Sequence, residues 1–325
     1  MFSAKNGKKI ILFFSDDKDE SSKKMQDEFI ARADFVQNLV KDFVLVNVSF
    51  SEARFSEAEK AEVIIYDTPD APEAEKNKAI NFVNTLLDDI NLARIYNVGQ
   101  TPAFYVVSED GLVIDVLPVS ADTTEARFME MLGGAQEKIA AFEGDMSKIK
   151  KARGVEKAQA IDAFFEKTPV DYRYFLTGLC KSLVEADKKN ESGLVGKHLL
   201  VIANNKAVDY FLDQNPTAAS DEFIAVAENE LLLPDDRQQA YYTAGYLLAQ
   251  SGSIQYGKIK DCFQKAYDAN PTSEYADKIK EMVQLAAERE AEFEKMMKES
   301  ESAANAPAPA PSEGANVPPA TENAQ

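Results

Sequence analysis

Residues able to carry covalent or acid–base chemistry are few in this chain of 325 residues. It contains two cysteines, Cys180 and Cys262, and a single histidine, His198. One histidine excludes a metal site built from several histidines, and it excludes a Ser–His–Asp triad confined to the first half of the chain. Two cysteines are too few for a disulfide framework. Both lie in helix-like stretches, where we expect small buried core residues, and we expect His198 to be structural.

The charge balance excludes one large class of partners. With 36 basic and 55 acidic residues, the formal net charge is −19. Binding to a nucleic-acid backbone requires a basic face, so we predict no nucleic-acid partner. The sequence has no apolar run of the roughly 18 residues that a membrane span needs, and no apolar signal core follows Met1.

The elements that would position a site change in kind along the chain. Up to about residue 117, apolar runs rich in Val, Ile and Phe alternate with helical patterns, which predicts an α/β fold. Residues Lys9–Phe14 form a continuous apolar run, typical of a buried central strand. Residues 19–41 have helical spacing with a break near Ala33, and residues 91–97 end another helix. Three more strands are expected, the last two as a hairpin: Phe43–Phe50, Ala103–Val107 and Leu112–Leu117.

This order of elements resembles the thioredoxin superfamily over roughly residues 8–132. The segment NLARIYNVGQTPAFYVVSEDGLVI is similar to the family pattern LAxxYxVxxTPTFxxxDxxGxxV, and Lys-Lys-Met at 23–25 matches the residues that follow the family's CxxC motif. The resemblance implies a central mixed sheet flanked by helices. It also implies a cis peptide bond before Pro102 and a peptide-binding groove at Thr101 and Pro102.

The chain departs from the family at the motif itself. Where the family has Cys-x-x-Cys, this chain has Asp19-Glu20-Ser21-Ser22. Asp19 takes the place of the attacking cysteine and Ser22 that of the resolving one; a shift of one residue would place Glu20 and Lys23 there. Neither register supplies the sulfur that thiol–disulfide exchange requires. We therefore predict a redox-inactive thioredoxin scaffold with no catalytic residue, no metal and no cofactor.

Residues 51–89 form a charged insertion after the second expected strand. They include four basic and ten acidic residues. Because loops tolerate insertions at small cost, we expect a solvated surface insertion. Within it, Val63–Tyr66 is a candidate for an added strand or for a flap over the groove.

The beginning of the chain resembles an interior part of the family's sequence. Residues Ser3–Lys9 look like the last turn of a helix that precedes the first strand in the resembling proteins. Either the upstream part has been removed or the gene starts unusually late. If that part contained a signal peptide, the protein would be periplasmic or otherwise extracytoplasmic.

From about residue 123 the apolar periodicity is helical. Ala160–Pro169 and Ala207–Pro216 share Ala, Asp, Phe and Pro at equivalent positions, and Tyr241–Pro271 resembles a tetratricopeptide unit. Stacked helical hairpins of this kind bury a common core and present a concave surface. We predict a domain order of a thioredoxin-like domain at 1–135, an all-helical tetratricopeptide-like domain at 136–301 and a disordered Ala/Pro-rich tail at 302–325.

Three functions are compatible with these features. The first is a protein-binding or scaffolding module that holds a peptide or protein partner near Pro102 and the segment Asp19–Ser22. The second is a glutathione-dependent, transferase-like enzyme that uses Ser21 or Ser22 at a helix N-terminus, although the acidic residues around that segment would raise the pKa of a thiol. The third is a purely structural subunit of a larger assembly.

Overall fold

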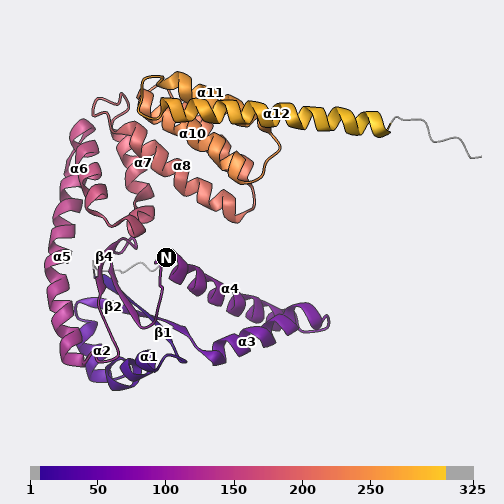
Figure 1. Ribbon diagram of the computed structural model, residues 1–325. Coiled ribbons are helices and arrows are strands. Elements are labelled where there is room, and N and C mark those ends of the chain that lie inside the picture. The colour runs from indigo at the N-terminus through magenta and orange to yellow at the C-terminus, as the bar shows by residue number, and fades with distance from the viewer. Residues whose placement is uncertain (1–7, 305–325) are drawn as a thin grey trace, which may run out of the picture. The chain divides into compact units, whose positions relative to one another are not determined.

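A computed structural model describes residues 8–304 of the chain (Figure 1). The chain contacts cluster into two compact units that divide between Lys206 and Ala207. The predicted boundary between residues 135 and 136 falls inside one long helix, α5 (Glu125–Lys151).

The first unit is built on a four-stranded mixed sheet in the order β2-β1-β3-β4. Strand β1 pairs in parallel with β2, starting at Lys9 opposite Phe43, whereas β3 pairs antiparallel with both β1 and β4. The central strand has apolar side chains on both faces because helical segments cover both faces of the sheet. The strands lie where the apolar runs predict them: β1 (Lys9–Asp16), β2 (Phe43–Phe50), β3 (Ala103–Val107) and β4 (Val113–Leu117).

One face of the sheet carries an aromatic core. The rings of Phe13 and Phe104 stack with their centroids 4.3 Å apart. Phe128 of α5 lies edge-on to Phe104, with centroids 4.8 Å apart. The segment predicted as a helix with a break also supplies this core, through Phe29 and Phe35. It consists of α1 (Glu20–Met25), the π-helical turn η1 (Gln26–Ile30) and α2 (Ala33–Leu39).

The opposite face is covered from a later part of the sequence. Tyr96, at the end of α4 (Glu73–Ile95), and Tyr105 of β3 pack with the rings of Tyr172 and Phe175. The last two residues belong to the 3-10 helix η3 (Val170–Leu176). A segment beyond α5 is therefore part of the core that holds the sheet.

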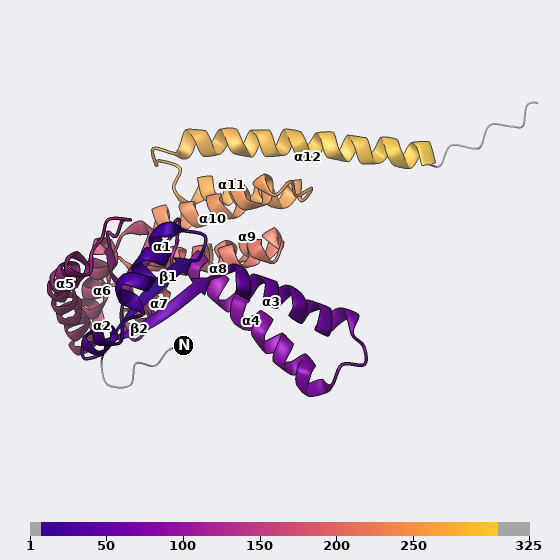
Figure 2. The same cartoon turned by 90° about the horizontal axis from the view of Figure 1, so that it is seen from below.

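The insertion after β2 is a helical hairpin, so Val63–Tyr66 is not the added strand that was one candidate for this segment. Helix α3 (Glu52–Glu62) continues into the π-helical turn η2 (Val63–Asp67), and α4 returns beside it (Figure 2). The periodicity of a short apolar run cannot distinguish a strand from a helix, and the β-branched residues here favour a strand. Here η2 packs on α4, and helical backbone bonds satisfy its amides without a neighbouring strand.

The remaining helices form successive hairpins in the helical part of the chain. Gly245 allows the close approach of α10 to α11, because an added Cβ would lie 3.1 Å from Cys262 Cβ and 3.2 Å from the ring of Phe263. These helices are α6 (Gly154–Lys167), α7 (Thr177–Ala186), α8 (Val195–Leu212), α9 (Pro216–Ala227), α10 (Pro234–Gln250), α11 (Tyr256–Ala269) and α12 (Ala276–Ala304).

Two terminal predictions lie mostly outside the described residues. The expected helical turn at Ser3–Lys9 falls almost entirely within residues 1–7, which are not described. The predicted tail begins at Ser302, but residues 302–304 still belong to α12, and the rest of the tail lies beyond the described range. Between residues 8 and 304, no helix combines the length and the apolarity that crossing a bilayer requires.

Candidate functional site

The segment that replaces the CxxC motif lies at the start of α1, directly after the central strand. Asp19 is the N-cap residue of this helix, with extended backbone angles. Its Oδ1 accepts a hydrogen bond from the Ser21 amide at 3.2 Å, and its Oδ2 accepts one from the Ser22 amide at 2.9 Å. These are amides that the first turn of a helix leaves without backbone partners. A carboxylate therefore occupies the donor end of α1.

Ser22 is held in the same arrangement and is 1% exposed. Its hydroxyl donates to Asp19 Oδ2 over 2.6 Å, the length of a charge-assisted hydrogen bond. Ser21 is half-buried and Glu20 is exposed to solvent. The hydroxyl at the resolving position thus serves as a donor to Asp19.

The structure brings the two sequence-predicted parts of the site together. The Thr101–Pro102 peptide bond is cis and immediately precedes β3. Partial burial acts to raise the pKa of Asp19, but hydrogen bonds from Ser22, Ser21 and the Thr101 side chain outweigh burial and hold that pKa below its usual range. Asp19 is therefore ionised at neutral pH.

The neighbouring acidic residues also bind backbone amides. Asp16 Oδ1 accepts from the Lys18 amide at 2.8 Å. Both carboxylate oxygens of Asp17 accept from the amide of Glu52, at the start of α3, at 3.0 and 3.1 Å. These carboxylates fix the loop between β1 and α1 and make it a region of negative charge. Such a loop favours a ligand that is neutral or positively charged over an anionic one.

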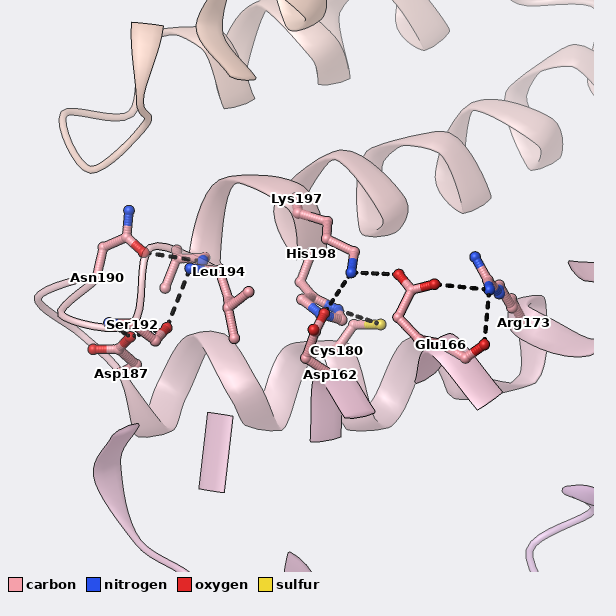
Figure 3. Close-up of polar contacts among 11 residues, drawn as sticks. Asp162, Glu166, Arg173, Cys180, Asp187, Asn190, Ser192, Leu194, Lys197 and His198 are labelled. Carbon is pink, nitrogen blue, oxygen red and sulfur yellow. Dashed lines mark hydrogen bonds and ion pairs between the residues drawn. The ribbon is translucent and has the colours of Figure 1, made fainter. Parts of the chain in front are cut away.

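A second polar cluster, which the sequence analysis did not predict, lies in the helical part of the first unit (Figure 3). His198 on α8 is fully buried. Its Nε2 lies 2.9 Å from Oδ1 of Asp162 on α6, and its Nδ1 lies 3.2 Å from Sγ of Cys180 on α7. A neutral imidazole then donates from Nε2 to the carboxylate and accepts the thiol proton at Nδ1.

The loop before α8 fixes the position of His198. Asp187, which is 4% exposed, accepts hydrogen bonds from the amides of Glu191 and Ser192, both at 2.9 Å. Asn190 Oδ1 accepts from the amide of Val195 at 3.0 Å, which caps the first turn of α8 (Figure 3). The side chain of His198 is therefore placed by a locally rigid helix start.

The electrostatics of this cluster suit a structural role better than a catalytic one. Burial lowers the pKa of His198, and Asp162 opposes this only in part. Burial raises the pKa of the Cys180 thiol to about 11. For Asp162, burial is outweighed by hydrogen bonds from Lys197 and His198, which lower its pKa. A Cys–His–Asp arrangement in which sulfur is 0% exposed and protonated offers no thiolate to a substrate.

Among residues 8–304, no group of three or more His, Cys, Asp or Glu side chains is arranged to hold a metal ion. Sequence reasoning missed the cluster around His198 because its members come from three helices. Their spacing has no local period, so only the packing of α6, α7 and α8 brings them together.

Comparisons with known proteins agree with this architecture. Residues 3–133 match a family model described as a thioredoxin-like domain, and residues 194–291 match one described as an uncharacterised protein C-terminal domain. An uncharacterised protein of Treponema pallidum (strain Nichols) is 30% identical over 145 residues, which cover 44% of this chain and 48% of that protein. The chain thus spans about half the length of this curated relative.

A solved structure titled "DsbH Oxidoreductase" is also similar. It is 18% identical, with a TM-score of 0.28, and the match covers 42% of this chain and 76% of that one. The mixed sheet, the helix that starts at Asp19 and the cis bond at Pro102 lie inside the segment that the first family model matches. The chain therefore contains a thioredoxin-like domain, and a helical C-terminal region follows it.

Proposed function

We propose that this protein is a redox-inactive thioredoxin-like module that binds an extended polypeptide of a partner protein. The observation that carries the proposal is the Asp19 carboxylate at the start of α1. It accepts the hydrogen bonds of two amides and one hydroxyl, where a thiol oxidoreductase places a reactive thiolate. The fold and its helix N-terminus are retained, while the sulfur is absent from the segment Asp19–Ser22.

The binding part of the proposal rests on Thr101 and Pro102. In the family that this domain resembles, the groove beside the cis-proline holds extended polypeptide. Here the Thr101 side chain lies beside Asp19, so the acidic loop forms one edge of the proposed groove. An acidic edge favours polypeptide segments that carry lysine or arginine.

The glutathione-dependent alternative has less support. Ser22 is buried and its hydroxyl donates to Asp19, so it is engaged as a donor within the protein. The ionised Asp19 beside Ser21 would also raise the pKa of any thiol bound there. Titration calorimetry with glutathione is expected to show no binding heat, and saturable binding would revive this alternative.

A redox assay tests the first half of the proposal. The wild-type protein is expected to give no turnover in the reduction of insulin by dithiothreitol. The double variant Asp19→Cys/Ser22→Cys restores two thiols at the start of α1 and is expected to gain measurable turnover, since the helix N-terminus lowers a thiol pKa. Turnover by the wild type would overturn redox inactivity.

A crosslinking experiment tests the second half. A benzoylphenylalanine photo-crosslinker is incorporated at Thr101, and in a control protein at Lys181, an exposed residue of α7. The probe is reduced and alkylated α-lactalbumin, a permanently unfolded chain. Crosslinks from position 101 and not from position 181 support the groove. Equal labelling from both positions contradicts it, and no labelling from either favours the purely structural alternative.

A further inference from the structure

The hairpin formed by α3 and α4 exposes large apolar side chains along its length. On α4 the exposed fractions are 39% for Ile80, 50% for Leu87 and 39% for Ile90. On α3 Phe55 is 41% exposed. Val83, which lies between Ile80 and Leu87 in the sequence, is partly buried. We call these five residues the hairpin face.

The spacing of these residues makes them one continuous surface. Ile80, Val83, Leu87 and Ile90 follow one another at intervals of three or four residues, which defines a single stripe on a helix. Ala79 and Leu86, which directly precede Ile80 and Leu87, are buried. The stripe therefore lies beside the surface with which α4 packs on α3, and not within it.

The contribution of α3 lies on the same side of the hairpin. Ala58 and Ala61 of α3 are buried, and Phe55 is rotated by roughly a quarter turn from them at about 100° per residue. On α4 the stripe is rotated about the helix axis in the same sense, relative to the buried residues Ala79 and Leu86. Because the two helices run antiparallel and side by side, both rotations lead to the same face (Figure 1, Figure 2). The exposed apolar side chains of both helices therefore lie on one side of the hairpin, where a third helix can pack against them.

The charge of the hairpin determines which partner fits this surface. Residues 52–95 contain ten acidic and five basic side chains, a net charge of −5. Arg54 is engaged in an ion pair with Asp89 at 2.8 Å, while Glu59 and Glu62 are exposed on α3 near the hairpin face. A second copy of the chain would bring the same negative charge, and an anionic lipid surface would be repelled for the same reason.

We propose that the hairpin face binds an amphipathic helix of a partner protein whose polar side is basic. Its apolar side covers Phe55, Leu87 and Ile90, and its lysine or arginine side chains lie against Glu59 and Glu62 of α3. Burying an apolar stripe while pairing the flanking charges is the way in which grooves select helices. This surface is distinct in its residues from the proposed groove at Pro102, so each proposal can fail without the other.

The test uses the full chain and a fluorescein-labelled model peptide of about 18 residues, built from leucine and lysine to form a basic amphipathic helix. Binding is measured by fluorescence anisotropy at physiological ionic strength. The variant Leu87→Glu is expected to bind the peptide at least about tenfold more weakly. The substitution makes the hairpin more acidic, so unspecific attraction of a cationic peptide would increase, and a loss of binding identifies the apolar contact.

A matched control separates this face from exposed leucines in general. Leu285 on α12 is 48% exposed, close to the value for Leu87, and Leu285→Glu adds the same charge. It is expected to bind the peptide as the wild type does. Ile80→Ser is a second variant of the face, and circular dichroism of every variant checks that the helices are retained.

Three outcomes would overturn the proposal. The first is binding by Leu87→Glu that equals or exceeds wild-type binding. The second is an equal loss in Leu285→Glu. The third is a wild-type dimer in light scattering, or binding to phosphatidylglycerol vesicles, that Leu87→Glu abolishes, because either would assign the face to a second copy or to a membrane.

Discussion

At the scale of single residues, Asp19 changes the chemistry of a helix start while keeping its electrostatics. A carboxylate and a thiolate are both anions that the N-terminal end of a helix stabilises. The carboxylate also accepts hydrogen bonds from the amides of Ser21 and Ser22 and from the Ser22 hydroxyl. The Asp19 carboxylate, at the position of the attacking cysteine of the CxxC motif, therefore stabilises the loop.

This arrangement predicts a specific dependence of stability on pH. Because the pKa of Asp19 is lowered in the folded protein, its contribution is present at neutral pH and is lost as the pH falls below about 4. Asp19→Asn keeps a good N-cap but removes the charge, so it should cost about 1 kcal/mol at neutral pH and little in acid. Urea unfolding at both pH values measures this difference.

The control for that prediction is Glu20→Gln. It removes the same charge from the adjacent residue, whose side chain is exposed. A surface charge of this kind is worth little, so its unfolding free energy should stay within about 0.5 kcal/mol of the wild type. If both variants change stability equally, the hydrogen bonds to Asp19 do not determine the effect.

His198 predicts a second pH dependence at a higher pH. Burial lowers its pKa, so the unfolded chain binds a proton before the folded protein does, and stability should fall as the pH drops below about 6.5. His198→Gln retains a donor near Asp162 but does not titrate. It should be less stable than the wild type at neutral pH, with a flatter profile between about pH 7 and 5. Equal slopes for the two proteins would contradict a neutral buried imidazole.

The sequence could predict one of these two clusters and not the other. Asp19 and Pro102 were identifiable because the resemblance to the thioredoxin family assigns them positions in a known order of elements. The contact between His198 and Cys180 joins α8 to α7, and Asp162 comes from a third helix. No periodicity in a sequence encodes which buried polar groups meet across helices. The contacts of His198 with Cys180 and Asp162 are therefore visible only in the folded structure.

At the scale of elements, the packing of α10 on α11 depends on one glycine. A Cβ at Gly245 would lie 3.1 Å from Cys262 Cβ and 3.2 Å from the Phe263 ring, so these buried side chains would have to shift by a few tenths of an ångström. Gly245→Ala is therefore expected to destabilise the protein by about 1–3 kcal/mol. Thermal unfolding followed by circular dichroism measures the loss.

Gly144→Ala is the matched control for this prediction. Gly144 lies inside α5, and an added Cβ would meet nothing within 4 Å. The same substitution should then stabilise the protein by about 0.5–1 kcal/mol, because alanine is the better helix former. Opposite signs for the two variants are expected; stabilisation by both would show that helix propensity outweighs the contact at Gly245.

Strands were easier to predict than the insertion for a physical reason. The run Lys9–Phe14 is apolar on both faces of β1, and the runs for β2 and β3 are bounded by polar or turn residues. In the insertion, Val63–Tyr66 is also apolar, with three β-branched residues, but it continues a helix that has already begun at Glu52. The choice between helix and strand there depends on contact with α4, which lies later in the sequence.

At the scale of the whole molecule, the division after Lys206 predicts independent local stability. Each unit has its own apolar core, around Phe13 in the first and around Phe263 in the second. Hydrogen–deuterium exchange in increasing urea should show Gly245→Ala accelerating exchange in α10 and α11 while β1 and β3 are unchanged. Exchange that rises together in both units would mean that they unfold as one.

The two buried cysteines can each report how often the structure around them opens. Cys180 is 0% exposed in the first unit and Cys262 is 3% exposed in the second. Burial raises the pKa of each thiol to about 11, so neither reacts readily with an alkylating reagent while its surroundings stay closed. The rate at which each thiol is labelled therefore records how often its own unit opens, without any engineered probe.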